Sequence, residues 1–171
     1  MTKIRVYLAA PGFNEEQMTK INNVETALEA EGYEVYSPFR DGIRLAPDSG
    51  REDREKVWVE NTRGMDSSDL SIAILDDKDT GTLVEFGWQA KADHPIIAYA
   101  PRVGRLNVML AEAVLAFCES PDKLLEVLRK IREPLESRKA IAMNLLSYSS
   151  LLKDPFFASL RDDYRYTGVI Q

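Results

Sequence analysis

Two carboxylates six positions apart carry the strongest chemical signal in this sequence. Asp79 and Glu85 lie in the segment Asp79–Gly87, where Gly81 suits a tight turn from a strand into a helix. Glu85 has apolar neighbours, which is unusual for a purely solvated glutamate. Paired carboxylates suit glycosidic chemistry, because one attacks an anomeric carbon while the other handles the proton of the leaving group. The spacing fits equally well a structural interpretation, with Asp79 as a helix cap and Glu85 on the surface.

The composition restricts which other chemistry is open to the chain. Its 171 residues are 44% hydrophobic and include one histidine, His94, and one cysteine, Cys118. These counts exclude an intrachain disulfide and metal sites built from several histidines or cysteines. The net charge of -6 argues against non-specific nucleic-acid binding, which depends on neutralising phosphates. We interpret His94 as a loop or surface residue and Cys118 as a buried small apolar residue.

Nothing in the sequence predicts a membrane protein. No apolar run approaches the roughly 20 residues of a membrane span, and the first residues lack the apolar core of a signal peptide. With a single unpaired cysteine, we expect a cytoplasmic protein.

Short apolar runs alternate with helical segments along most of the chain. Strands are expected at 4–9, 33–37, 70–75, 95–99 and 114–117, and helices at 15–31, 55–65, 82–92, 108–110 and 121–132. This alternation predicts an α/β fold, a doubly wound sheet of five parallel strands with helices on both faces. Ligands bind such sheets beyond the carboxyl ends of the strands, which directs attention to the segments that follow them, at 10–14, 39–53, 76–85 and 100–109.

Two segments are not explained by this alternation. Residues 39–53 are polar and irregular, and we expect a long loop that could form a lid. Its arginines are interpreted as solvated, or alternatively as a grip on a phosphate; they are Arg40, Arg44, Arg51 and Arg54. Residues 134–171 are expected to form a C-terminal helical extension, with a helix over 136–153, packed on the core or on a neighbouring subunit. Trp58 and Trp88 are expected in the core or in a subunit interface, with stacking on a base as the alternative.

Several segments, in the right order, resemble nucleoside 2-deoxyribosyltransferases. They are Val6–Gln17, Gly32–Pro38, Ser68–Asp76, Asp79–Gly87 and Leu106–Met109. The resemblance spans about residues 3 to 132, so residues 1–133 are expected to form the catalytic domain, with residues 134–171 as an extension of it. The family fold is flavodoxin-like, in agreement with the sheet predicted above.

The resemblance implies the transfer of a 2-deoxyribosyl group between nucleobases, with retention, through a covalent glycosyl-enzyme. Glu85 resembles the nucleophile, Asp79 the proton donor and acceptor, and Tyr7 the phenol that holds the nucleophile by a hydrogen bond. The implied substrates are 2′-deoxynucleosides and free nucleobases, with no metal and no cofactor. Glu85 must be ionised to attack, and we expect the helix N-terminus to help keep it so.

The resemblance also implies substrate-binding residues. Phe13 and Met109 resemble residues that line the sugar and base pocket, and Asn107 resembles an amide that reaches sugar hydroxyls, often in a neighbouring subunit. Asn61 stands where some members have an aspartate that contacts the base; an amide can still read a base edge but cannot shuttle a proton. Members form dimers that assemble into hexamers, so we expect a homo-oligomer, either a dimer or a hexamer.

Two alternatives are weighed against the transferase. The first is a hydrolase of 2′-deoxynucleoside 5′-monophosphates, whose relatives usually carry a serine-containing phosphate loop after the first strand and tend to lack the aspartate. This chain has Ala10-Pro11-Gly12-Phe13 there and keeps Asp79, which favours the transferase. The second is a non-catalytic nucleotide-binding module, which would gain nothing from two carboxylates aimed at a sugar. Base preference and tolerance of ribose stay open.

Overall fold

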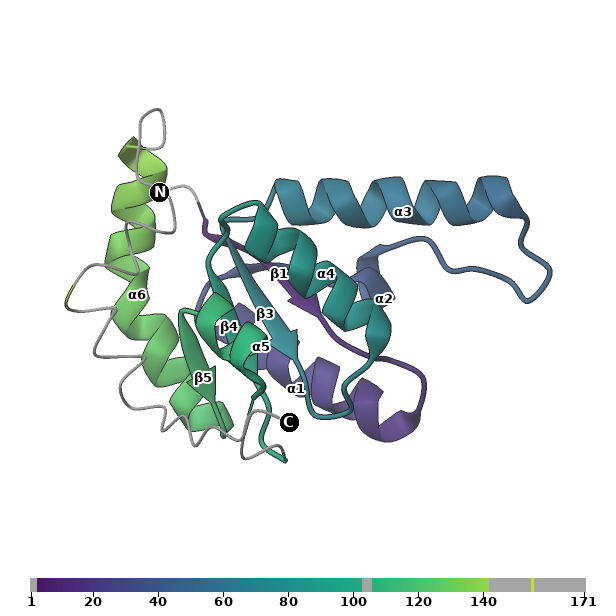
Figure 1. The fold of residues 1–171 in the computed structure, drawn as a ribbon. Helices are drawn as coiled ribbons and strands as arrows, with labels where there is room; N and C mark the ends of the chain where they lie inside the picture. Colours follow the sequence, from purple (N-terminus) through teal and green to yellow (C-terminus); the bar gives the residue numbers. More distant parts are fainter. Residues whose placement is uncertain (1–2, 103–105, 142–154, 156–171) are drawn as a thin grey trace.

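The computed structural model describes residues 3–102, 106–141 and 155. Five parallel strands form one sheet in the order β2-β1-β3-β4-β5 (Figure 1). The strands are β1 (Arg5–Ala9), β2 (Glu34–Tyr36), β3 (Leu70–Ile74), β4 (Ile96–Tyr99) and β5 (Ala116–Cys118). This topology confirms the predicted flavodoxin-like, doubly wound α/β fold.

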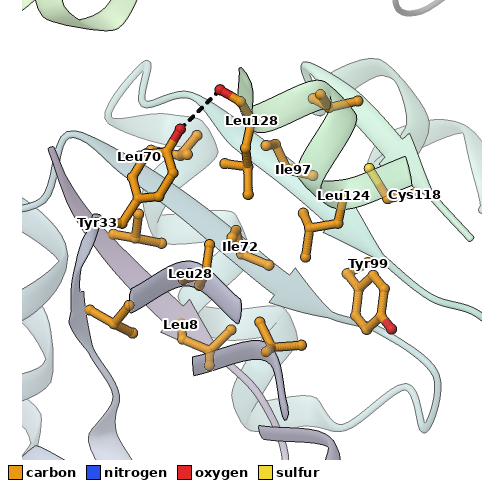
Figure 2. Close-up of a cluster of buried hydrophobic side chains, with 14 of the residues drawn as sticks. Leu8, Leu28, Tyr33, Leu70, Ile72, Ile97, Tyr99, Cys118, Leu124 and Leu128 are labelled. Carbon is orange, nitrogen blue, oxygen red and sulfur yellow. Dashed lines mark hydrogen bonds between the residues drawn. The ribbon is translucent and has the colours of Figure 1, made fainter. Parts of the chain in front are cut away.

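Six helices within the described ranges surround the sheet. They are α1 (Glu15–Ala30), α2 (Pro38–Asp41), α3 (Arg51–Asp66), α4 (Thr80–Lys91), α5 (Val108–Ala113) and α6 (Pro121–Ile141). The helices α1 and α6 cover one face, and α4 and α5 cover the other (Figure 1). Figure 2 shows the α1 and α6 face, where Leu28 and Leu128 pack over Ile72 and the Tyr33 hydroxyl donates to the Leu128 carbonyl at 2.9 Å.

The alternation of side chains along β1 decides which residues can reach a functional site. Val6 and Leu8 point into the cluster under α1 and α6, whereas Tyr7 and Ala9 point into the cluster under α4 and α5. From β1 the chain adds β2 on one side of it and then returns to add β3 on the other side. The switch point of the sheet therefore lies between β1 and β3. The loops that follow these two strands therefore border the crevice in which such folds bind ligands.

The segment 39–53 differs from its prediction as one irregular loop. Helix α2 occupies its beginning and α3 starts at Arg51, so the irregular part is limited to 42–50. Pro38 at the first turn suits a helix start, and the Asp41 carboxylate accepts from the Ser37 N–H at 2.9 Å, which closes this short turn. The Arg51–Glu55 ion pair, 2.7 Å and four residues apart, supports the early start of α3.

The Arg40 side chain in this segment is 38% exposed, but its guanidinium is already paired within the protein. Its guanidinium donates to Glu29 at 2.6 Å, to Asp41 at 2.9 Å and to the Val35 carbonyl at 2.5 Å. The side chain therefore fastens α2 to α1 and β2.

Helix α6 is longer than expected. The sequence predicts a helix that stops at Arg132 and another that starts at Glu136, but one helix runs through Pro134 to Ile141. A proline inside a helix removes one hydrogen bond, yet an apolar stripe of Leu128, Ile131 and Leu135 packs on the sheet and holds the helix together. Most of the predicted extension, residues 142–154 and 156–171, lies outside the described residues, and the boundary at residue 134 stays a prediction.

The single residues singled out above have different outcomes. Cys118 is buried, as predicted, and His94 lies in a loop with Nε2 2.5 Å from the Ser68 carbonyl oxygen. Of the alternatives for the tryptophans, core packing is excluded, because Trp58 is 52% exposed and packs edge-to-face on Trp88 with ring centroids 5.6 Å apart; a subunit interface stays a prediction. Among the described helices, none is both long and apolar enough to span a bilayer.

Candidate functional site

A hydrogen bond between β1 and α4 forms the centre of the candidate site. Tyr7 sits in the middle of β1 and is fully buried, with its ring on the α4 side of the sheet. Its hydroxyl donates to Oε1 of Glu85 at 2.9 Å. Burial, followed by the charge of Glu85, raises the pKa of Tyr7, so the phenol stays protonated and keeps its role as a donor. This contact matches the hydrogen bond implied by the family resemblance.

Glu85 lies beside the buried face of α4. The buried residues of this helix define the side that packs against the sheet; they are Thr82, Phe86 and Gln89. Burial raises the pKa of Glu85 to about 7, the negative charge of Asp79 adds to this, and the hydrogen bond from Tyr7 opposes it. The net shift therefore runs against the expectation that the helix N-terminus helps to keep Glu85 ionised. Glu85 lies beyond the first turn of α4, where the effect of the helix dipole on a charge is small. The cost of desolvating the ionised carboxylate is larger than this effect.

Asp79 caps the same helix. Its Oδ2 accepts from the backbone N–H of Thr82 at 2.7 Å and from the Thr82 hydroxyl at 3.0 Å. A Cβ on Gly81 would lie 3.0 Å from this oxygen, a tight contact that glycine avoids. The structural interpretation of Asp79 as an N-cap is confirmed, and that of Glu85 as a surface residue is wrong. Since the charge of Asp79 raises the pKa of Glu85, the two carboxyl groups also interact.

Asn61 reaches the site from α3. Its Nδ2 lies 3.5 Å from Oε1 of Glu85, at the long end of hydrogen-bonding distance. The hydrogen bonds described for the Glu85 carboxyl group, from Tyr7 and from Asn61, both end on Oε1. Among the described residues, none donates to Oε2. One oxygen of Glu85 is thus held by two donors, and the other accepts no hydrogen bond described in this part of the chain.

The remaining candidates lie at the same edge of the sheet without touching Glu85 in any described contact. Phe13 follows β1 and is 74% exposed, and Met109 in α5 is 75% exposed. Asn107 caps α5, where its Oδ1 accepts from the N–H groups of Met109 at 2.9 Å and Leu110 at 3.3 Å. The structure therefore brings together Tyr7, Asn61, Asp79 and Glu85, and it leaves Phe13, Asn107 and Met109 open to solvent.

Tyr36 is a contact that the sequence reasoning missed. Its ring stacks on Tyr7 with centroids 5.7 Å apart and an interplanar angle of 25°. Gly64 allows this arrangement, because a Cβ there would come within 2.5 Å of the Tyr36 ring. The contact could have been inferred from the pairing of Tyr7 with Tyr36 in the parallel strands β1 and β2. That inference requires the register of the two strands, which the sequence does not provide.

An apolar cavity of ≈ 410 Å³ lies between α1 and α6, lined in part by Val24, Leu124 and Tyr99. None of the candidate site residues lines it. Across the described ranges, no group of three or more histidine, cysteine, aspartate or glutamate side chains is arranged to hold a metal ion.

Comparison with known proteins adds the family. The family model described as nucleoside 2-deoxyribosyltransferase matches residues 6–128. The chain belongs to the nucleoside 2-deoxyribosyltransferase family. The match runs from β1 into the first part of α6 and contains all the candidate site residues. A search of curated protein sequences finds no match to this family member.

Solved structures agree with this assignment. A 2-deoxyribosyltransferase from the psychrotolerant bacterium Bacillus psychrosaccharolyticus is 28% identical, with 68% of this chain and 86% of that chain covered and a TM-score of 0.63. A conserved protein from Enterococcus faecalis V583 is 19% identical (90% and 97% covered, TM-score 0.52). A CMP N-glycosidase from Clostridium botulinum is 21% identical (73% and 97% covered, TM-score 0.51). The last two share the fold, and the family as a whole supports an enzyme acting on nucleosides.

Proposed function

We propose that this enzyme moves a 2-deoxyribosyl group between nucleobases through a covalent intermediate on Glu85. The observation that carries the proposal is the pair of Tyr7 and Glu85 at the switch point of the sheet, with Asp79 at the start of the same helix. Family membership supplies the class of reaction. The geometry suggests how each group acts in it.

In the first half-reaction, Oε2 of Glu85 forms a bond to C1′ of a 2′-deoxynucleoside while the C1′–N bond breaks. The electron pair of that bond goes to the departing base, and Asp79, which must carry a proton at this moment while Glu85 is ionised, gives that proton to the base. Tyr7 and Asn61 hold Oε1, which aims the other oxygen at the sugar. The partly buried carboxylate is poorly solvated, and its negative charge favours an oxocarbenium-like transition state.

In the second half-reaction, a nitrogen of another base attacks C1′ and the ester bond to Glu85 breaks. The electron pair returns to the carboxylate, and Asp79 takes the proton from the incoming base. Two displacements at C1′ give overall retention, and no metal, cofactor or further reactant is needed to balance the steps. Asn61, within reach of Glu85, is placed to contact the base or the sugar through an amide that both donates and accepts.

The charge at this edge of the sheet favours nucleosides over nucleotides. Asp76 and Asp77 follow β3 after Leu75, and Arg102 links them to Glu16 at the start of α1. The nearby cations Lys20 and Arg102 are already paired with these carboxylates. A 5′-phosphate approaching here would meet carboxylates and neutralised cations, which supports the transferase over the monophosphate hydrolase.

The decisive experiment gives the protein a 2′-deoxynucleoside together with a different free base, and separates the products by chromatography. We expect a new deoxynucleoside that contains the second base. In parallel, a 2′-deoxynucleoside 5′-monophosphate is supplied alone. Release of free base from the monophosphate much faster than exchange between nucleosides would contradict the transferase and establish the hydrolase.

Replacing Asp79 with asparagine should lower the exchange rate by about 100-fold or more, because an amide cannot carry the proton of the base. Asparagine caps helices as well as aspartate does, so the fold should be preserved and the unfolding temperature nearly unchanged. Thr82→Ser serves as the matched control, since it keeps the hydroxyl that donates to Asp79. Exchange by Asp79→Asn at the wild-type rate would limit Asp79 to its role as a cap.

We also propose that the enzyme works as a homo-oligomer, either a dimer or a hexamer. The exposed Phe13 and Met109 support this, because large apolar side chains at a site edge are suited to being covered by a neighbouring subunit. The mass in solution, measured by light scattering after size-exclusion chromatography, tests this part of the proposal.

A further inference from the structure

The side chain of Gln17 joins two loops that carry candidate site residues. Its Oε1 accepts from the backbone N–H of Phe13 at 2.7 Å, in the loop after β1. Its Nε2 donates to Oδ2 of Asp77 at 2.9 Å, in the loop after β3 and two residues before Asp79. A single amide therefore uses its acceptor on one side of the switch point and its donor on the other.

The third loop of the site joins the same network. The Arg102 side chain donates to the second carboxylate oxygen of Asp77, with Nη2 and Oδ1 2.9 Å apart, and to Glu16 at 2.7 Å. The Arg102 N–H donates to Oδ1 of Asp76 at 2.8 Å. The Asp76 carboxylate is fully buried and also forms an ion pair with Lys20, so the network has an anchor in the interior. Arg102 follows the end of β4 and precedes Asn107 by five residues.

The loop after β3 needs such an anchor. Lys78 has a φ of 51°, in the left-handed region that residues other than glycine seldom adopt. Backbone of this kind persists when the surrounding contacts determine it. Lys78 stands directly between Asp77, which is held by Gln17 and Arg102, and Asp79, which caps α4. The position of Asp79 relative to Glu85 therefore depends on the contacts made by Asp77.

We propose that Gln17, acting through Asp77, is a positioning residue that sets the placement of Asp79 and Phe13 about the reacting sugar. This inference rests on the proposed function, which gives the two loops their roles. The role requires an amide, because one end must accept from Phe13 while the other donates to Asp77.

The pairing can be broken and then restored by exchanging the two groups. In Gln17→Glu a carboxylate faces the Asp77 carboxylate, and the contact becomes repulsive. In Asp77→Asn the single amide oxygen can accept from either Gln17 or Arg102, so the hydrogen bond from the other residue is lost. In the double variant, the new carboxylate at position 17 still accepts from the Phe13 N–H. The new amide at position 77 donates to that carboxylate while its oxygen accepts from Arg102, and the double variant has the net charge of the wild type.

The first readout is steady-state base exchange. We expect each single variant to lose about fivefold in kcat with a nearly unchanged unfolding temperature, and the double variant to return within about twofold of the wild type. A purely structural contact would change the unfolding temperature without this pattern in kcat. Single variants with wild-type kcat, or a double variant no better than the single variants, would overturn the inference.

The second readout does not depend on catalysis. Hydrogen exchange of the backbone amides of Phe13 and Thr82, measured by NMR, should be faster in both single variants and slow again in the double variant. If the wild type shows no base exchange, the proposed function fails, and this measurement still decides whether Gln17 couples the loops. Equal protection in all four proteins would overturn the coupling itself.

Discussion

Replacing Glu85 with glutamine should reduce base exchange by at least about 1,000-fold, because an amide oxygen cannot form the covalent bond to C1′ that the proposed mechanism requires. Glutamine has the size of glutamate and keeps an oxygen that can accept from Tyr7 and Asn61, so the site should remain assembled. The measurement is the rate at which a second base enters a deoxynucleoside, followed by chromatography.

Glu55→Gln is the matched control for this variant. Glu55 lies on α3 in an exposed ion pair with Arg51, so its loss of charge should leave exchange unchanged. Intact-mass spectrometry of the protein mixed with a deoxynucleoside should also show a sugar adduct on the wild type that Glu85→Gln lacks. Base exchange by Glu85→Gln at the wild-type rate would refute the role of Glu85 as nucleophile.

The same substitution should make the protein more stable at neutral and alkaline pH. The pKa of Glu85 is raised from 4.5 to about 7 in the folded chain, mainly by burial. The folded state thus favours the protonated carboxyl, and ionising it as the pH rises from 4.5 through about 7 lowers the free energy of unfolding. A shift of this size corresponds to about 3 kcal/mol above pH 7. Glutamine never ionises, so Glu85→Gln avoids this cost.

Denaturant unfolding of the wild type and of Glu85→Gln near pH 5 and near pH 8 measures this effect. We expect the variant to be more stable by about 3 kcal/mol near pH 8 and by only about 1 kcal/mol near pH 5. All other ionisable groups are common to both proteins, so the difference isolates Glu85. A stability difference that does not change between the two pH values would contradict the raised pKa. If Glu85 is the nucleophile that we propose, this loss of stability is an expected trade of stability for activity.

The sequence predicts the sheet because each strand is a short apolar run, and it predicts the start of α1 because that helix has a capping residue. Leu70–Ile74 is apolar and β-branched, and Asn14 accepts from the N–H of Gln17 as the predicted cap of α1. The continuation of α6 could not be predicted, since Pro134 predicts a break and only the packing of Leu135 on the core compensates for it. Local pattern decides where helices begin, and tertiary contacts decide where this one ends.

The candidate site was predictable in its residues and not in its electrostatics. Asp79 and Glu85 are found from their spacing and their resemblance to a known family. The raised pKa of Glu85 depends on how far the packing of α4 on the sheet buries its carboxyl group. The stacking of Tyr36 on Tyr7 depends on the register of β1 and β2. The bridge made by Gln17 joins positions sixty residues apart, a contact that no local pattern indicates.

The tryptophan pair makes the site observable without a label. The chain has two tryptophans, and both belong to the contact between Trp58 on α3 and Trp88 on α4. Each stands three residues from a site residue on its own helix, Asn61 and Glu85. The tryptophan fluorescence of this protein therefore comes entirely from the junction of the two helices that hold the reacting carboxylate, and its intensity and wavelength report on how closely they pack.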